Sequence, residues 1–92
     1  MRVAWSSRAV ADLKTISEYI ERDRDLSTAN RVTRNIYDAI QGLVTMPNRG
    51  RSGRVEGTRD LVIVPSPYIV VYQVFPERVL VLNIVHGAQR WP

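Results

Sequence analysis

The fold is decided by residues 61–85, which read LVIVPSPYIVVYQVFPERVLVLNIV. This stretch contains three apolar runs rich in β-branched residues: Leu61–Val64, Tyr68–Phe75 and Val79–Val85. Short tripeptides with proline, residues 65–67 and 76–78, separate them, and such breaks are typical of turns between strands. A parallel connection needs a dozen or more residues. The stretch therefore predicts three strands paired antiparallel.

Two amphipathic helices are predicted before these strands. The first runs from a serine cap at Ser6 or Ser7 to about Arg22, and its apolar face is Ala9, Leu13, Ile16 and Ile20. The second opens at Ser27 or Thr28 and ends before Pro47, which disfavours helix in the residue preceding it. Its apolar stripe is Ala29, Val32, Ile36, Ala39, Ile40 and Leu43. The connector is short, so the helices are expected to form an antiparallel hairpin.

A short opening strand is predicted at Val3–Trp5, where apolar residues alternate with others. Residues 47–58 hold three glycines and are expected to be an irregular loop. The predicted order is therefore β-α-α-β-β-β in a single domain spanning residues 1–92. This order indicates an α+β fold, a helical hairpin packed on one side of a small curved antiparallel sheet. Both faces of the later strands look apolar, so we expect the second face to be partly exposed or covered by a partner.

The composition excludes several classes of function. The chain has no cysteine and one histidine, which leaves no disulfide, no thiolate site and no spacing for a metal site. No phosphate-binding or dinucleotide motif is present, so no cofactor is expected. No apolar run approaches the roughly 20 residues that a membrane span needs, and the N-terminus lacks the apolar stretch of a signal peptide. We therefore expect a cytoplasmic protein without a membrane partner.

The charge points to an anionic partner. The net charge is +4, and twelve of the thirteen basic residues are arginine, whose planar fork grips carboxylates and phosphates. Arg49, Arg51 and Arg54 lie in the glycine-rich loop, and Arg59 follows it. These four arginines are candidates for binding phosphates or acidic side chains. The alternative is a solvated basic loop.

Two residues near the C-terminus are further candidates. His86 has a reference pKa of about 6.5, which suits a general acid or base, although a lone histidine at a strand end is more often a structural hydrogen-bonding group. Trp91 could stack on bases. The carboxylates of the first helix and its connector, Glu18, Glu21, Asp23 and Asp25, are interpreted as solvated charge.

The chain resembles the ParE/RelE superfamily of type II toxins over nearly its whole length. The resemblance is carried by Trp5-Ser6, Ala9, Asp12-Leu13, Ile16 and Tyr19-Ile20, then by Pro47, Gly50-Arg51, Gly53-Arg54, Gly57–Leu61, Pro67–Tyr72, His86–Ala88 and Arg90–Pro92. It implies a growth-inhibiting toxin, neutralised by a cognate antitoxin whose acidic C-terminal segment wraps around it, in a higher-order complex. It also implies that Arg49, Arg51, Arg54, Arg59, His86, Arg90 and Trp91 are candidates for binding the antitoxin or the target.

The resemblance leaves two activities open. RelE-like members cut mRNA on the ribosome and place basic residues where this chain has Asp60, Val62, Ile69 and Gln89. Such apolar or acidic side chains cannot stabilise charge developing on a phosphate. We therefore favour the ParE-like branch, whose members poison DNA gyrase without known nuclease chemistry. The alternative is a ribosome-dependent endoribonuclease with Arg59, His86 and Arg90 as its catalytic site.

Overall fold

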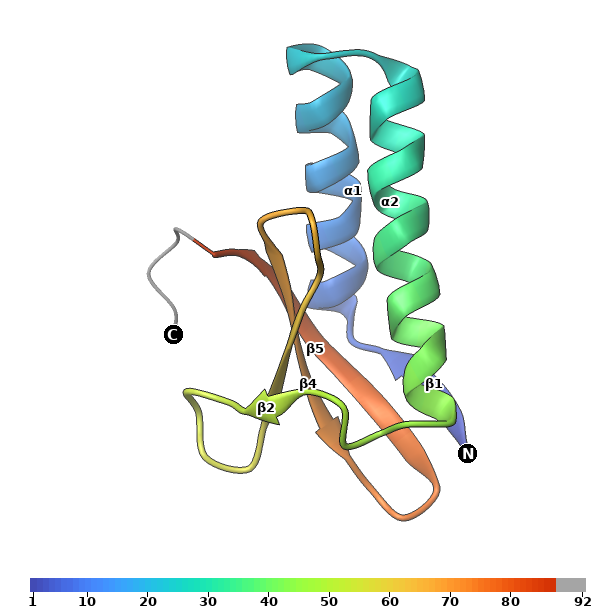
Figure 1. The fold of residues 1–92 in the computed structure, drawn as a ribbon, viewed down its shortest axis with the longest axis vertical. Coiled ribbons are helices and arrows are strands. Elements are labelled where there is room, and N and C mark those ends of the chain that lie inside the picture. Colours follow the sequence, from blue (N-terminus) through green and yellow to red (C-terminus); the bar gives the residue numbers. More distant parts are fainter. Residues whose placement is uncertain (88–92) are drawn as a thin grey trace.

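A computed structural model describes residues 1–87, which form a helical hairpin on one side of a twisted sheet (Figure 1). The elements in chain order are β1 (Arg2–Trp5), α1 (Ser7–Asp23), α2 (Leu26–Gln41), the short 3-10 helix η1 (Gly42–Val44), β2 (Arg51–Ser52), β3 (Arg59–Val62), β4 (Tyr68–Val74) and β5 (Arg78–His86). The predicted α+β class and the order of its main elements are confirmed. In this part of the chain, no helix is long and apolar enough to cross a membrane.

The strands form one mixed sheet in the order β1-β5-β4-β3-β2. The predicted antiparallel pairing of β3, β4 and β5 is confirmed. The expectation of a purely antiparallel sheet is wrong at one edge, because β1 pairs with β5 in parallel, Arg2 opposite Arg78 and Trp5 opposite Val81. Short turns force antiparallel pairing, but most of the chain separates these two strands, so no such constraint applies to them.

The loop at residues 47–58 is also less irregular than predicted. Arg51 and Ser52 form β2 and pair antiparallel with Asp60 and Arg59. The amide of Gly53 donates to the carbonyl of Thr58 at 2.8 Å, which closes this small hairpin. The pairing extends the sheet by one short edge strand.

Capping side chains fix where the helices begin. Ser6 caps α1 and accepts a hydrogen bond from the amide of Ala9 at 3.0 Å, as predicted. The helix α2 begins at Leu26, slightly earlier than the predicted opening at Ser27 or Thr28. Its cap is Asp25, interpreted from the sequence as solvated charge, which accepts from the amide of Thr28 at 2.7 Å. Hydrogen bonds from Thr28 hold the pKa of the Asp25 carboxyl below its usual value. The charged carboxylate therefore favours the folded state, and this contribution is lost as the pH falls through the lowered pKa.

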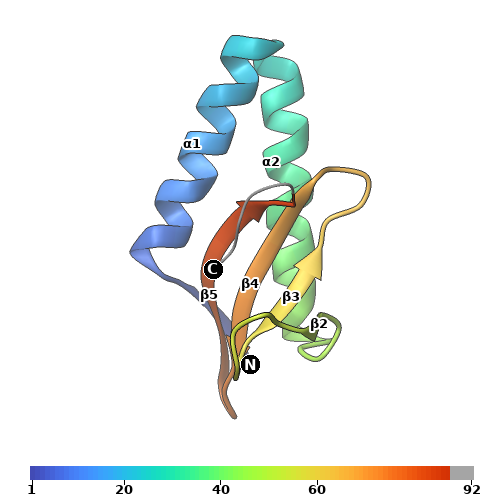
Figure 2. The same ribbon diagram turned by 90° about the vertical axis from the view of Figure 1, so that its left-hand side faces the viewer.

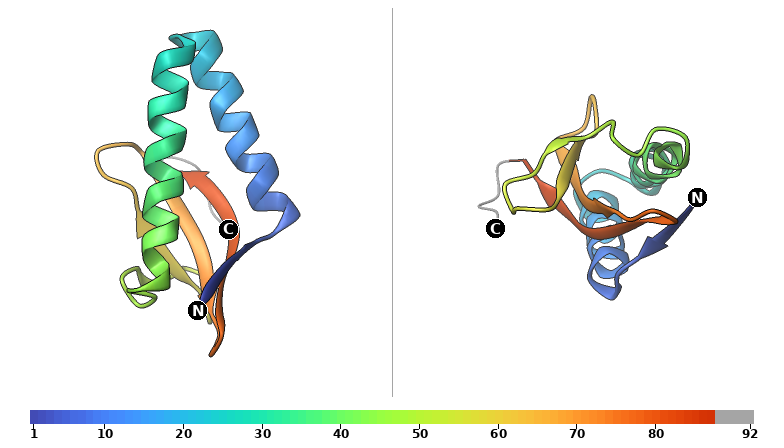
Figure 3. Two further views of the ribbon diagram at one scale, coloured as in Figure 1. Left: turned by 90° about the vertical axis from the view of Figure 1, so that its right-hand side faces the viewer. Right: turned by 90° about the horizontal axis from the view of Figure 1, so that it is seen from below.

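The apolar stripes of both helices pack against one face of the sheet, as predicted (Figures 2 and 3). Ile36 and Ile40 of α2 are fully buried, as are Val70 and Tyr72 of β4 and Val81 of β5. The hairpin projects beyond the turn that joins β3 to β4, so its far end has no strand beneath it (Figure 1). This overhang borders a hollow that is lined by both helices and by the turn between β3 and β4.

Polar side chains from the start of α1 complete the exposed edge of β5. The strand β1 ends opposite Val81, while β5 continues to His86. Beyond that point the hydroxyl of Ser6 donates to the carbonyl of Leu82 at 2.8 Å, and Asp12 Oδ2 accepts from the amide of Ile84 at 2.9 Å. The helical periodicity predicts Asp12 on the solvated face of its helix, but the residue anchors α1 to the sheet.

This anchor predicts an unequal response to two substitutions on the same helix. Asp12→Ala removes the acceptor of a part-buried amide, and the free energy of unfolding should fall by about 1–3 kcal/mol. Glu21→Ala removes an exposed carboxylate of α1 and should change it by less than about 0.5 kcal/mol. Thermal and denaturant unfolding measure both values. Equal melting temperatures for the two variants would contradict the anchoring role.

Candidate functional site

The arginine-rich loop is anchored to the core by Tyr72. The Tyr72 hydroxyl accepts from the amide of Gly50 at 2.8 Å and donates to the carbonyl of Pro47 at 2.8 Å. Burial raises the pKa of this fully buried tyrosine, so its hydroxyl is protonated at neutral pH and can donate. One side chain therefore holds both ends of the segment 47–50 against the sheet.

Arg59, a predicted binding and candidate catalytic residue, also binds this segment. Its Nη1 donates to the carbonyl of Gly50 at 2.7 Å and to that of Asn48 at 3.3 Å. Gly50 has no room for a side chain, because a Cβ there would lie 2.7 Å from the Tyr72 hydroxyl and 2.9 Å from the carbonyl oxygen of Asp60. The guanidinium of Arg59 thus has a structural role in shaping the loop.

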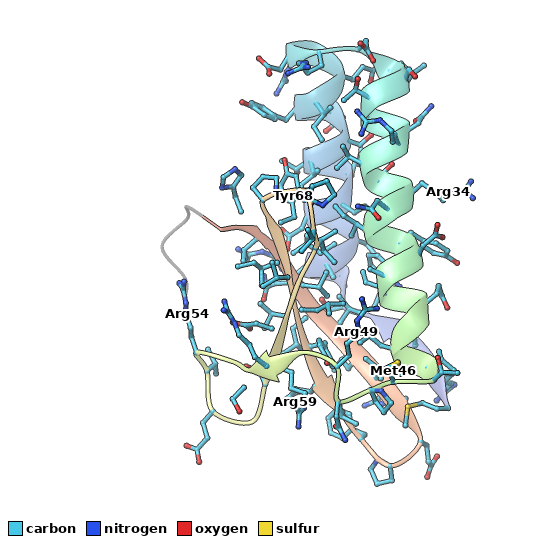
Figure 4. All side chains as sticks on the ribbon, viewed as in Figure 1. Arg34, Met46, Arg49, Arg54, Arg59 and Tyr68 are labelled. Atoms are coloured by element: carbon cyan, nitrogen blue, oxygen red, sulfur yellow. The ribbon has the colours of Figure 1, made fainter. Side chains whose placement is uncertain are left out.

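The other three loop arginines are exposed on the surface. Arg51 lies in β2, and Figure 4 shows Arg49, Arg54 and Arg59 around that strand at one end of the sheet. The structure therefore brings together the four arginines of the predicted loop site. We call this group, Arg49, Arg51, Arg54 and Arg59, the arginine loop.

His86 lies at the other end of β4 from the arginine loop. It is paired with Tyr68, whereas Arg59 is paired with Tyr72, and four residues of strand span about 13 Å. The structure therefore does not bring Arg59 and His86 into one site. Arg90 and Trp91, the remaining candidates, lie outside the described residues. No group of three or more possible metal ligands occurs within residues 1–87.

The rings of His86 and Tyr68 meet edge to face, with centroids 5.6 Å apart. Burial, and next the neighbouring Tyr19, raise the pKa of the Tyr68 hydroxyl. All three side chains line a hollow of about 1200 Å³ between the overhanging hairpin, the β3–β4 turn and the end of β5. We call this hollow the hairpin trough.

The hairpin trough combines an apolar floor with many arginines. Ile16, Ile20, Val32 and Ile84 contribute to its lining, and the first two and Ile84 belong to the buried core. Its arginines are Arg8, Arg22, Arg24, Arg31 and Arg34, against the two carboxylates Asp12 and Asp38. Arg8 forms an ion pair with Asp12, with 3.6 Å between Arg8 Nε and Asp12 Oδ1. The trough is therefore a strongly basic groove with apolar surface at its base.

The sequence pattern did not identify these trough arginines as site residues. They alternate with polar residues on two helices and in the connector between them, a pattern that is typical of solvated charge. One signal was available: Arg31 and Arg34 flank the apolar stripe at Val32, so they border the packed face of α2. The overhang of the hairpin, which converts that border into a groove wall, has no signature in the sequence.

The fold and these surfaces define a small basic protein in which a helical hairpin packs on a sheet, and comparison with known proteins identifies the family. Residues 3–91 match the family described as ParE toxin of type II toxin-antitoxin system, parDE. The chain belongs to this family and is a toxin of a type II toxin–antitoxin system.

Individual relatives agree with this assignment. The chain is 40% identical over 91 residues to "Putative toxin Y4kP" of Sinorhizobium fredii, covering 99% of this chain and 93% of that protein. It is 36% identical over 88 residues to Toxin RelE2 of Caulobacter vibrioides, covering 96% of this chain and 97% of that toxin. A solved chain of the chromosomal ParDE system from P. aeruginosa shares the fold, with a TM-score of 0.86 and 24% identity over 94% of this chain and 95% of that chain.

Two glycines provide a matched test of the loop anchor. Gly50→Ala places a methyl group against Tyr72 and a backbone carbonyl, and this overpacking should cost about 1–3 kcal/mol of stability. Gly42→Ala meets nothing within 4 Å in a helical backbone and should leave stability unchanged or slightly higher. Denaturant unfolding measures both. An equally stable Gly50→Ala protein would show that the loop is not held as described.

Proposed function

We propose that this toxin poisons DNA gyrase through the arginine loop and is neutralised by an acidic, amphipathic segment of its antitoxin bound in the hairpin trough. The observation that carries the proposal is the trough, with apolar side chains at its base and five arginines in its lining. The match to a toxin–antitoxin family supports the presence of an antitoxin.

The chemistry of the trough favours an acidic amphipathic peptide. Amphipathic helices bind grooves by placing their apolar face on the groove floor. Carboxylates on the flanks of such a helix would meet the arginines of the trough, and arginine holds a carboxylate with two parallel hydrogen bonds. Apolar burial would then supply most of the affinity, while exposed arginine pairs add about 0.2–1 kcal/mol each.

The chemistry of the sheet supports action without RNA cleavage. Asp60 is 3% exposed, and its Oδ1 accepts no hydrogen bond from the described residues. A buried carboxylate at this position repels a phosphate, whereas RelE-like toxins place a basic residue there. Arg59 is engaged by two loop carbonyls, and His86 lies at the far end of β4. A protein-binding poison needs none of these groups as a proton donor or acceptor.

One observation favours the alternative, a RelE-like ribosome-dependent endoribonuclease. His86, whose imidazole is the most common general acid or base in enzymes, lines the trough together with Tyr19, Tyr68 and several arginines. A relative with 36% identity is also named RelE2. In this alternative His86 is the general acid or base, Arg90 is a further candidate, and the antitoxin blocks RNA from the trough. Arg59, the third predicted catalytic residue, lies too far along β4 to act in the same site.

A paired assay separates the two activities. The purified toxin should induce gyrase-dependent DNA cleavage and should leave ribosome-bound mRNA intact. His86→Ala should keep this activity, because no proton transfer depends on it. The triple change of Arg49, Arg51 and Arg54 to serine should weaken it without lowering the melting temperature, since these side chains are exposed. Ribosome-dependent cleavage that falls by about 10²–10⁴ in His86→Ala would establish the nuclease instead.

Binding of the antitoxin tests the trough separately. Arg31→Glu, within the trough, should raise the dissociation constant of the antitoxin complex by roughly tenfold, because a carboxylate then faces an acidic segment. Arg2→Glu changes the net charge equally but lies on β1, outside the trough lining, and should change it by less than about threefold. Isothermal titration measures both. Equal losses would show that only the overall charge of the toxin matters.

A further inference from the structure

A second hollow lies on the opposite side of α1 from the trough and shares no lining residue with it. It encloses about 510 Å³ and is lined by Trp5, Val10, Leu13, Lys14, Ser17, Glu18, Thr33 and Tyr37. We call this surface the helical seam, because it follows the groove between the outer sides of α1 and α2. It is available whether or not the trough is occupied.

The seam exposes apolar side chains that the core does not need. Val10 is 56% and Tyr37 46% exposed, although the inner faces of both helices already pack on the sheet. The ring of Tyr37 stacks on that of Trp5, with centroids 6.4 Å apart and planes at 22°. Small residues, Ser17 and Thr33, lie beside these protruding ones, so the surface offers both projections and space to receive them.

Charge distinguishes the seam from the rest of this basic molecule. Its lining contains one cation and one anion, Lys14 and Glu18, whereas the trough lining holds five arginines and two aspartates. Two copies of a chain with net charge +4 repel each other. A second copy therefore approaches with least repulsion through a surface whose charges cancel, while an acidic partner is drawn to the trough.

The spacing of the two charges is self-complementary. Lys14 and Glu18 are one helical turn apart on α1, so they lie on the same face of the helix. When two α1 helices cross antiparallel about a two-fold axis between these positions, Lys14 of each copy lies opposite Glu18 of the other. A two-fold contact uses the same patch on both subunits and requires this kind of pattern.

From these observations we infer that the helical seam binds a second copy of this chain, forming a two-fold dimer of hairpins. The dimer leaves the trough of each copy open to an antitoxin segment. It thus provides a contact between toxin subunits within a larger toxin–antitoxin assembly. The inference does not depend on the target of the toxin or on where the antitoxin binds.

Sedimentation of the purified full chain across roughly 1–100 µM tests the dimer, since weak interfaces dissociate in this range. We expect a species of twice the chain mass of 10.5 kDa. Tyr37→Glu places a charge in the apolar seam and should raise the dimer dissociation constant at least about tenfold. Tyr19→Glu, similarly exposed on α1 but lining the trough, should leave it unchanged. A parent protein that is monomeric throughout, or equal effects of both changes, would overturn the inference.

A charge exchange tests whether the partner is a second copy. Lys14→Glu alone brings two carboxylates face to face across the two-fold axis, and Glu18→Lys alone brings two ammonium groups together. Each should weaken the dimer by roughly fivefold. The double variant restores opposite charges across the axis and should recover the parent dissociation constant. Circular dichroism confirms that all variants are folded. Failure of the double variant to recover would contradict the two-fold arrangement.

Discussion

The bond between the Asp12 carboxylate and the amide of Ile84 is the constraint on which the arrangement of the two layers depends. It joins the first helix to the last strand, between residues that are 72 positions apart in the chain. At this point β5 extends beyond Val81, where its pairing with β1 ends. Apolar stripes alone would allow the hairpin to slide along the sheet, because dispersion and hydrophobic contacts are non-directional. Asp12 and Ser6 fix the position of the hairpin along β5. At this position the far end of the hairpin extends beyond the strands, and this projecting part forms a wall of the trough.

A second group of polar side chains, Tyr72 and Arg59, forms hydrogen bonds at the opposite end of the sheet. Tyr72 and Arg59 together bond three carbonyls and one amide of the segment 47–50. Ordering a short segment that contains glycine costs conformational entropy, and these hydrogen bonds offset that cost. Arg59 takes part in these hydrogen bonds, whereas the side chains of Arg49, Arg51 and Arg54 are exposed on the surface. The two ends of the molecule are thus built alike. At each end a buried or half-buried polar side chain, Asp12 or Tyr72, holds a segment in place by hydrogen bonds, and exposed arginines lie on the surface nearby.

The sequence predicted those features that depend on local periodicity. The stripes of Ile16 and Ile36, and the antiparallel strands separated by two short turns, follow from spacing that a few neighbouring residues specify. Features that depend on distant partners were missed. The parallel pairing of β1 joins strands from opposite ends of the chain, and Asp12 finds its partner in β5. Asp25 is closely followed by Ser27 and Thr28, which are also residue types that cap helices, so the residue type alone did not identify the cap. The trough arginines come from α1, α2 and their connector, and they line one groove only because of where the hairpin packs along the sheet. Of the predicted candidates, the four loop arginines lie together, and His86 belongs to the other end.

The distance between the two ends constrains how one antitoxin can silence the proposed toxin. Arg59 and His86 mark ends of the sheet about 13 Å apart along β4, which exceeds the Debye length of about 8 Å at physiological salt. Acidic residues confined to the trough therefore leave most of the positive field of the arginine loop in place, and such an antitoxin would act by occupying the trough alone. An antitoxin that also covers the loop must extend about 13 Å beyond the trough along β4. A fully extended segment covers that length with roughly four residues, whereas a helix needs about nine. If the antitoxin is helical in the trough, the shortest way to reach the loop is to leave the helix and continue as an extended chain.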